Sequence, residues 1–280
     1  TLGGAGHASV VAGRLTGKGR LIGIDQDEAA IEAATARLEP FKEHVTIVRD
    51  NYRNTPAVLQ QLQIDGIDGM LLDLGVSSYQ LDNAERGFSY RQNAPLDMRM
   101  SKSGISAADI VNTYSKEELV RILRDYGEEK FAFKIADRII SEREKAPIDT
   151  TLKLADIISS AVPARARRDG HPARKSFQAI RIAVNGELDE LETALDKAFA
   201  LLNKEGRLAI ITFHSLEDRI VKQTFKELEA DCVCDKNAPI CVCGKRREIK
   251  ILTKPVSPDK SEIDDNPRAA SAKLRACERV

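Results

Sequence analysis

The chain has 280 residues and balances 43 lysines and arginines against 43 aspartates and glutamates. This length is enough to bury one large core or two smaller ones. Because the formal net charge is zero, overall charge does not indicate a polyanionic partner, and a nucleic-acid site must come from local clustering. No run approaches the roughly 18 apolar residues of a membrane span, and no signal-peptide pattern opens the sequence. We therefore expect a cytoplasmic protein without membrane contact.

Strand and helix patterns alternate over the first hundred residues. The chain opens with a glycine loop at residues 1–7, which leads into a helix. The short apolar runs that predict strands cover residues 20–24, 45–48 and 67–72, and the helices between them cover residues 27–38 and 56–62. This alternation predicts a doubly wound α/β fold with a parallel sheet. Because such loops normally follow a strand, we expect the sheet to need a first strand ahead of Thr1, missing from this chain.

The pattern becomes helical after residue 100. Helices are expected at residues 116–126, 128–144 and 151–161, and one long helix at residues 172–202. A buried strand follows at residues 207–213, and two tail segments, 249–253 and 272–279, form a candidate hairpin. We therefore predict a sheet domain made of residues 1–100 and 179–280. A helical substrate domain, residues 101–178, is inserted in it.

Three features of the predicted sheet favour a nucleotide-type cofactor. The glycine loop lets backbone amides approach a ligand at a helix N-terminus. Asp25 ends a strand 19 residues after Gly6, where an acid can accept from both ribose hydroxyls. Asp73 places a further carboxylate at the end of the strand 67–72, which methyl transfer to nitrogen can use and a dehydrogenase does not need. Tyr52 follows the intervening strand and either packs beside an adenine or covers the core.

Ten short motifs occur in order along the chain: Thr1–His7, Ile24–Asp25, Leu71–Gln80, Arg86–Ser89, Pro95–Met100, Tyr126–Glu129, Phe177–Ile182, Asn185–Leu188, Phe213–Arg219 and Asn266–Arg268. Together they resemble the bacterial small-subunit ribosomal RNA cytosine-N4 methyltransferases, the RsmH or MraW family. The resemblance spans essentially the whole chain. It implies a Rossmann-like, S-adenosyl-L-methionine (AdoMet)-dependent class I methyltransferase domain with an inserted helical substrate domain. The implied substrate is a cytidine in the decoding region of 16S rRNA, within the small ribosomal subunit.

Residue by residue, the resemblance implies an AdoMet site formed by Ala5, Gly6, His7, Asp25, Tyr52, Asp73 and Gln80. Two positions depart from the commoner pattern, because Ala5 replaces a glycine and Ala8 a serine. A methyl group at position 5 fits only if φ there is negative. Asp73, or a carbonyl of the turn after it, is the catalytic candidate, which would accept a hydrogen bond from an N–H of the cytosine amine. Water or a carboxylate such as Asp97 would take the proton, and positioning and electrostatics would do most of the work.

The candidate RNA-binding residues are mostly basic: Arg165, Arg167, Arg168, Arg174, Lys175, Arg181 and His214. The cluster from Arg165 to Lys175 would contact phosphates without reading sequence, although a solvated loop is the alternative. Phe88 and Tyr90 either stack on an extruded base or pack the inserted domain onto the sheet. His214 is either a substrate contact or a structural histidine. Ser215, Glu217 and Asp218 also suit the start of a helix.

The five cysteines are an odd number, which fits reduced thiols better than a disulfide framework. Four of them, Cys232, Cys234, Cys241 and Cys243, lie close enough to hold one structural Zn²⁺. The CxC spacing suits a reduced loop equally well, so no metal ligand is predicted and the metal status of these cysteines stays open. Cys277 is expected in the core. The oligomeric state stays open, with a homodimer as one option.

Two other functions compete with methyl transfer. A ribosome-assembly factor would bind RNA and AdoMet without turnover, although an intact Gly6, Asp25 and Asp73 argue against it. A nicotinamide-linked oxidoreductase would share the glycine loop. The motifs after Asp73 give no reason to expect it.

Overall fold

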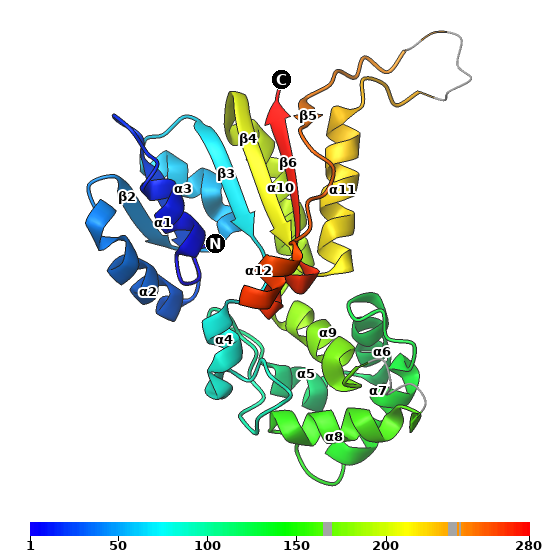
Figure 1. Cartoon of the computed structure of the whole chain (residues 1–280). Coiled ribbons are helices and arrows are strands. Elements are labelled where there is room, and N and C mark those ends of the chain that lie inside the picture. Colours follow the sequence, from blue (N-terminus) through cyan, green and yellow to red (C-terminus); the bar gives the residue numbers. More distant parts are fainter. Residues whose placement is uncertain (165–169, 235–239, 241) are drawn as a thin grey trace.

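The computed structural model describes residues 1–164, 170–234, 240 and 242–280, and places the strands in two neighbouring sheets (Figure 1). The strands are β1 (Leu21–Asp25), β2 (Val45–Arg49), β3 (Ile67–Asp73), β4 (Leu202–Thr212), β5 (Ile249–Ile251) and β6 (Lys273–Arg279). All six were predicted from the sequence. Strand β4 begins five residues earlier than expected, because Leu202 already pairs with Ile67 of β3. The predicted α/β fold class is confirmed.

Parallel pairing puts the carboxyl ends of the first strands at one edge. Strands β1 and β2 pair in parallel and form one sheet, and the second sheet has the order β3-β4-β6-β5. Strand β3 is parallel to β4, whereas β6 is antiparallel to both β4 and β5, as expected of the predicted terminal pair. Thr1 lies beside the end of β3, where its hydroxyl accepts a 3.0 Å hydrogen bond from the Asp73 amide and donates to the Asp73 carbonyl.

The sheets are packed by helices whose apolar faces are buried. These are α1 (Gly6–Ala12), α2 (Glu28–Leu38), α3 (Thr55–Gln61), α10 (Glu187–Leu201) and α11 (Ser215–Glu229). Leu195 and Phe225 from the last two helices pack with Leu72 and Leu208 of the strands in one buried cluster. Burial of these side chains is what holds the helices to the second sheet.

A second core belongs to the helical region shown below the sheets in Figure 1. Its helices are α5 (Ala107–Thr113), α6 (Lys116–Asp125), α7 (Ala132–Arg143), α8 (Thr151–Ala161) and α9 (Ala173–Asn185). Leu119, Ile122 and Leu123 recur at helical spacing on one face of α6 and are fully buried. Two short helices, α4 (Ser78–Asp82) and α12 (Lys260–Asp265), lie between the sheets and this region. The described helices include none that is long and apolar enough to cross a membrane.

The prediction of a single helix over residues 172–202 is wrong. The chain breaks at Gly186, whose φ of 60° and ψ of 30° are left-handed, so that it ends α9 and begins α10. Glycine adopts this conformation without the steric cost that other residues meet. The guanidinium of Arg181 donates two hydrogen bonds, of 2.7 and 2.8 Å, to the Glu187 carboxylate across the break. The break therefore turns α10 away from the helical region and onto the sheet.

A buried ion pair connects the end of β1 with the connection that leads into the helical region. Arg86 donates to Asp27 at 2.7 Å, and their side chains are 8% and 2% exposed. Arg86 also donates to the carbonyls of Arg99 and Met100 at 2.9 and 3.0 Å. Asp27 accepts further from the Gln80 amide group at 2.6 Å and caps α2 through the Ala29 amide. Among the described residues, neither side chain of the pair has a buried polar atom without a hydrogen-bond partner, as a buried ion pair requires.

Replacing Arg86 with methionine should lower the free energy of unfolding by about 3–5 kcal/mol, because it leaves the Asp27 carboxylate buried without its counter-ion. Urea denaturation measures this change. The matched control is Arg49→Met, which removes an ion pair to Glu28 whose partners are both 51% exposed, and it should cost less than about 1 kcal/mol. Equal effects of the two substitutions would contradict the assigned role of Arg86.

Candidate active site

A cavity of about 1080 Å³ opens at the carboxyl edge of the strands, between the glycine loop and the helical region. It brings together most of the predicted cofactor and RNA residues: Gly6, His7, Asp25, Tyr52, Asp73, Gln80, Arg174, Arg181 and His214. Ala5 and Lys175 are not among the described residues that line it. Residues that are far apart in the sequence meet here because parallel strands deliver their ends to one edge.

At Ala5 the glycine loop has a different backbone geometry from the one expected. The φ of Ala5 is 55°, so the expectation of a negative φ is wrong. This conformation costs an L-residue roughly 1–2 kcal/mol. The Ala5 side chain is fully buried in a cluster with Ala34 and Leu38, so packing offsets the cost. The methyl group therefore points into the core under the loop, and the cavity is lined by Gly3, Gly4 and Gly6 instead.

Asp25 holds the glycine loop in place. One of its carboxylate oxygens accepts from the amides of Leu2 and Gly3 at 2.9 and 3.1 Å, and the other accepts from the amide of Asp27 at 3.0 Å. The carboxylate still borders the cavity. Its position at the end of β1 is the one predicted. The hydrogen bonds that hold the glycine loop were not predicted from the sequence.

Asp73 presents its carboxylate to the cavity, with its side chain 34% exposed. Its one side-chain partner among the described residues is His7, whose Nδ1 lies 3.2 Å from Oδ2. The hydrogen bond to Asp73 raises the pKa of His7 above its ordinary value, against the opposing effect of partial burial, and the charges of Asp73 and Glu262 add to the rise. The arrangement leaves the second Asp73 oxygen available for a ligand in the cavity.

Gln80 and Tyr52 lie in the cavity wall. The Gln80 side chain accepts from the Ser77 amide at 2.9 Å, closing the capping box of α4, and donates to Asp27. Its amide group is therefore already used in building the site. Tyr52 begins a short 3₁₀ helix after β2. Burial raises the pKa of Tyr52, and the negative charges of Glu187, Glu190 and Glu217 raise it further, so the neutral phenol is maintained.

The predicted basic residues have varied surroundings. Arg165, Arg167 and Arg168 lie outside the described residues. Arg174 is exposed at the start of α9 and lines the cavity. Lys175 is exposed and donates to the Glu128 carbonyl at 3.2 Å. Arg181 is held by Glu187, as described above, which neutralises its charge.

Aromatic side chains form the wall on the side of the helical region. Phe88 is buried and Tyr90 is half-buried, and both line the cavity. The Tyr90 ring stacks on His171 with centroids 4.4 Å apart and meets Phe177 edge-on at 5.6 Å. Both rings thus pack in the core of the helical region while they also face the cavity.

His214 is the N-cap residue of α11 and takes part in its capping box. The imidazole Nδ1 accepts from the Glu217 amide at 3.5 Å, and Nε2 lies 3.2 Å from a Glu217 carboxylate oxygen. Burial alone would raise the pKa of Glu217, but hydrogen bonds from His214 and Phe213 and the charge of Arg181 lower it. Glu187, His214 and Glu217 could in principle ligate a metal. Arg181 already compensates Glu187, so this group needs no cation.

One part of the site was not anticipated. Residues 267–272 line the cavity, and Arg268 holds them by donating to Asp82 at 2.5 and 3.1 Å and to the Ser78 carbonyl at 3.4 Å. The motif Asn266–Arg268 was the available signal, although it indicated no role. The prediction that Asp97 lies near the reacting atoms is wrong. Its carboxylate is bound by Arg99 at 2.6 Å and is not among the described residues that line the cavity.

An α/β fold that opens such a cavity beside a glycine loop, with an accessible carboxylate at the end of β3, suits the AdoMet-dependent methyltransferases predicted from the sequence. This class is confirmed by a protein-family comparison. The family described as the MraW methylase family matches residues 1–280, and the chain belongs to this family.

Two relatives carry the name ribosomal RNA small subunit methyltransferase H. The protein of Clostridium botulinum (strain Kyoto / Type A2) is 55% identical over 282 residues, which cover 100% of this chain and 91% of that protein. The protein of Lachnospira eligens is 55% identical over 283 residues, which cover 100% of this chain and 90% of that protein.

The contact between His7 and Asp73 should be visible in a pH titration. Because His7 has a raised pKa, its protonated form stabilises the fold. That stabilisation should be fully present below pH 6.5, while Asp73 stays ionised, and be lost as the pH rises through the raised value. NMR titration of the imidazole should show the pKa of His7 falling in Asp73→Asn. The exposed control Glu28→Gln should leave it unchanged, and an unaltered pKa in Asp73→Asn would refute the contact.

Proposed function

We propose that this protein transfers a methyl group from AdoMet to the exocyclic N4 amine of a cytidine in the decoding region of 16S rRNA, on small ribosomal subunits in the cytoplasm. The observation that carries the proposal is the position of Asp73. Its carboxylate faces the cavity between the glycine loop on one side and Phe88, Tyr90 and Arg174 on the other. A methyl donor bound on the glycine-loop side and a nucleobase bound on the other side can therefore meet beside the Asp73 carboxylate. The names of the relatives support the choice of ribosomal RNA.

The residues of the glycine-loop side fit AdoMet. A side chain built at Gly4 would meet no atom within 4 Å, so the loop leaves open space there. Loop amides at the beginning of α1 can approach the ligand, Asp25 borders the cavity at the ribose position, and Tyr52 offers a face beside an adenine. AdoMet supplies an activated methyl group on a positively charged sulfur.

The task of Asp73 follows from the weak nucleophilicity of the cytosine amine, whose lone pair is delocalised into the ring. A carboxylate that accepts an N–H hydrogen bond helps the nitrogen pyramidalise and attack in line. The new N–C bond forms as the S–C bond breaks, and one amine proton is then released to water or to the Asp73–His7 pair. Asp73 thereby acts on the reacting atoms, whereas Asp25 acts on the scaffold.

The other wall suits an unstacked nucleotide. Tyr90 and Phe88 face the cavity with aromatic surfaces, on which an extruded base can stack. Arg174 is exposed at the rim and is available for a phosphate, as a contact that positions the strand without reading its sequence. Arg165, Arg167, Arg168 and Lys175 are the other residues that we propose for phosphate contacts.

Asp73→Ala should lower the methyl-transfer rate by about 10²–10⁴-fold, the range for loss of a positioned acid–base group. The measurement is transfer of labelled methyl from AdoMet to small ribosomal subunits and to free 16S rRNA, followed by nucleoside analysis for N4-methylcytidine. Asp68→Ala is the matched control, because Asp68 lies exposed at the opposite end of the same strand.

Full turnover by Asp73→Ala would remove Asp73 from the mechanism. Absence of transfer by the unaltered protein, with AdoMet still bound in a calorimetric titration, would favour an assembly factor without turnover. Label in a different nucleoside would keep the enzyme class and reject the proposed base.

Arg174→Ala should weaken RNA binding and reduce the slope of log K against log salt by about one, because one phosphate contact is lost. Binding to 16S rRNA measured at several salt concentrations tests this, with AdoMet affinity unchanged. Arg124→Ala removes an exposed arginine from α6, outside the cavity, and should leave both the affinity and the slope as they are. A slope unchanged by Arg174→Ala would exclude a phosphate contact at this residue.

A further inference from the structure

The connection between α11 and β5 gathers cysteines at a place remote from the cavity. Helix α11 begins at Ser215, beside the cavity edge, and ends at Glu229 at the opposite end of the sheet. The connection projects from that end, away from α12 and the helical region (Figure 1). A function of this segment is therefore separate from the methyl-transfer site.

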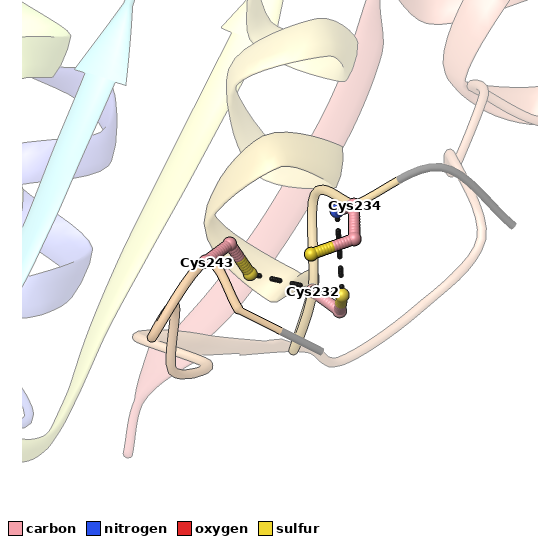
Figure 2. A group of neighbouring side chains, drawn as sticks. All are labelled: Cys232, Cys234 and Cys243. Atoms are coloured by element: carbon pink, nitrogen blue, oxygen red, sulfur yellow. Dashed lines mark hydrogen bonds between the residues drawn. The ribbon is translucent and has the colours of Figure 1, made fainter. Parts of the chain in front are cut away.

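Three cysteines of this connection point toward one another (Figure 2). The sulfur atoms of Cys232, Cys234 and Cys243 all lie within 4.8 Å of one another, and those of Cys232 and Cys243 are 3.7 Å apart. The first two come from one arm of the connection and the third from the returning arm. An exposed ion pair between Asp231 and Arg247, at 2.8 Å, also joins the arms.

Backbone amides are directed at each of the three sulfurs. Cys232 accepts from the amide of Cys234 at 3.3 Å, Cys234 accepts from that of Val242 at 3.4 Å, and Cys243 accepts from that of Val233 at 3.5 Å. Hydrogen bonds of this kind favour the charged form of the group that accepts them. Thiolate is the state in which cysteine binds a metal.

Hydrophobic packing does not account for the cluster. The neighbouring side chains Val233 and Val242 are 65% and 85% exposed. Between Phe225 and Ile249, the described residues contribute none of the buried core side chains. A segment without a core needs another source of order, and small units commonly obtain it from a structural metal.

We propose that Cys232, Cys234 and Cys243 bind one structural Zn²⁺ ion that holds the two arms of the α11–β5 connection together. Clustered thiolates select zinc over hard cations such as Mg²⁺ and Ca²⁺, which prefer oxygen ligands. Zinc is four-coordinate in such sites, and its remaining position takes a water molecule or a further protein ligand. The ion has no part in methyl transfer, so this site stands independently of the proposed function.

The test is zinc content of the full chain, purified under reducing conditions, loaded with Zn²⁺ and desalted against a weak chelator. Mass spectrometry of the metal should find about one zinc per chain. Cys232→Ser and Cys243→Ser should each lower the zinc affinity by more than the roughly 10–100-fold seen on losing an outer-shell partner. Cys277→Ala is the matched control, since Cys277 lies buried in β6. It should retain the ion.

A second measurement does not depend on the folding of any variant. Co²⁺ added to the unaltered reduced protein should give sulfur-to-metal charge-transfer absorption and the visible bands of a tetrahedral site, and Zn²⁺ should displace both. Absence of zinc and of these bands, or zinc retained equally in Cys232→Ser and Cys277→Ala, would overturn the proposal. Thiol titration of the purified protein gives a third outcome. Fewer free thiols than expected, in protein that contains no metal, would show a disulfide at the proposed zinc site and would also overturn the proposal.

Discussion

The buried ion pair between Asp27 and Arg86 is the constraint on which the geometry of the site depends. A charge that is removed from water destabilises the fold by several kcal/mol unless its partner is in place, so the two residues must meet. Asp27 follows β1 and caps α2, while Arg86 belongs to the connection that leads into the helical region. Gln80 donates to the same carboxylate and brings α4 into the network. The two walls of the cavity are thereby held at one spacing before any ligand binds, which limits the reorganisation required during the reaction.

The acids at the edge of the sheet have separate tasks that their surroundings decide. Asp25 accepts three backbone amides and so organises the glycine loop and the turn after β1. Asp73 has a single imidazole partner and keeps one oxygen toward the cavity. Glu187 is paired with Arg181, and Glu217 lies against the His214 imidazole. Of these carboxylates, Asp73 is the one with capacity left for a substrate, and the proposed chemistry rests on that difference in hydrogen bonding.

Sequence reasoning succeeded where a local pattern has a direct structural cause and failed where a distant partner decides. The strands were found because short apolar runs end at turn residues or carboxylates, and Asp73 was placed correctly because parallel strands end at one edge. The helix predicted over residues 172–202 was wrong because the apolar period continues through Gly186, whereas the break depends on its left-handed backbone and on the Arg181–Glu187 pair. Ala5 is left-handed because its methyl group packs against α2, which no local signal indicates. Asp97 was misplaced: the neighbouring Arg99 binds its carboxylate, and it is not among the described residues that line the cavity.

What the sequence by itself determined is the class of fold, the family and the edge at which the candidate site lies, because periodicity, strand ends and ordered motifs are properties of contiguous residues. Only the tertiary structure decided which polar group each charge would meet. Asp25 binds the loop amides, Gln80 binds Asp27, His7 binds Asp73, and three cysteines converge at the far end of the sheet. The physical reason is that a buried or half-buried polar group must find a partner. The chain supplies that partner only once distant segments have been brought together.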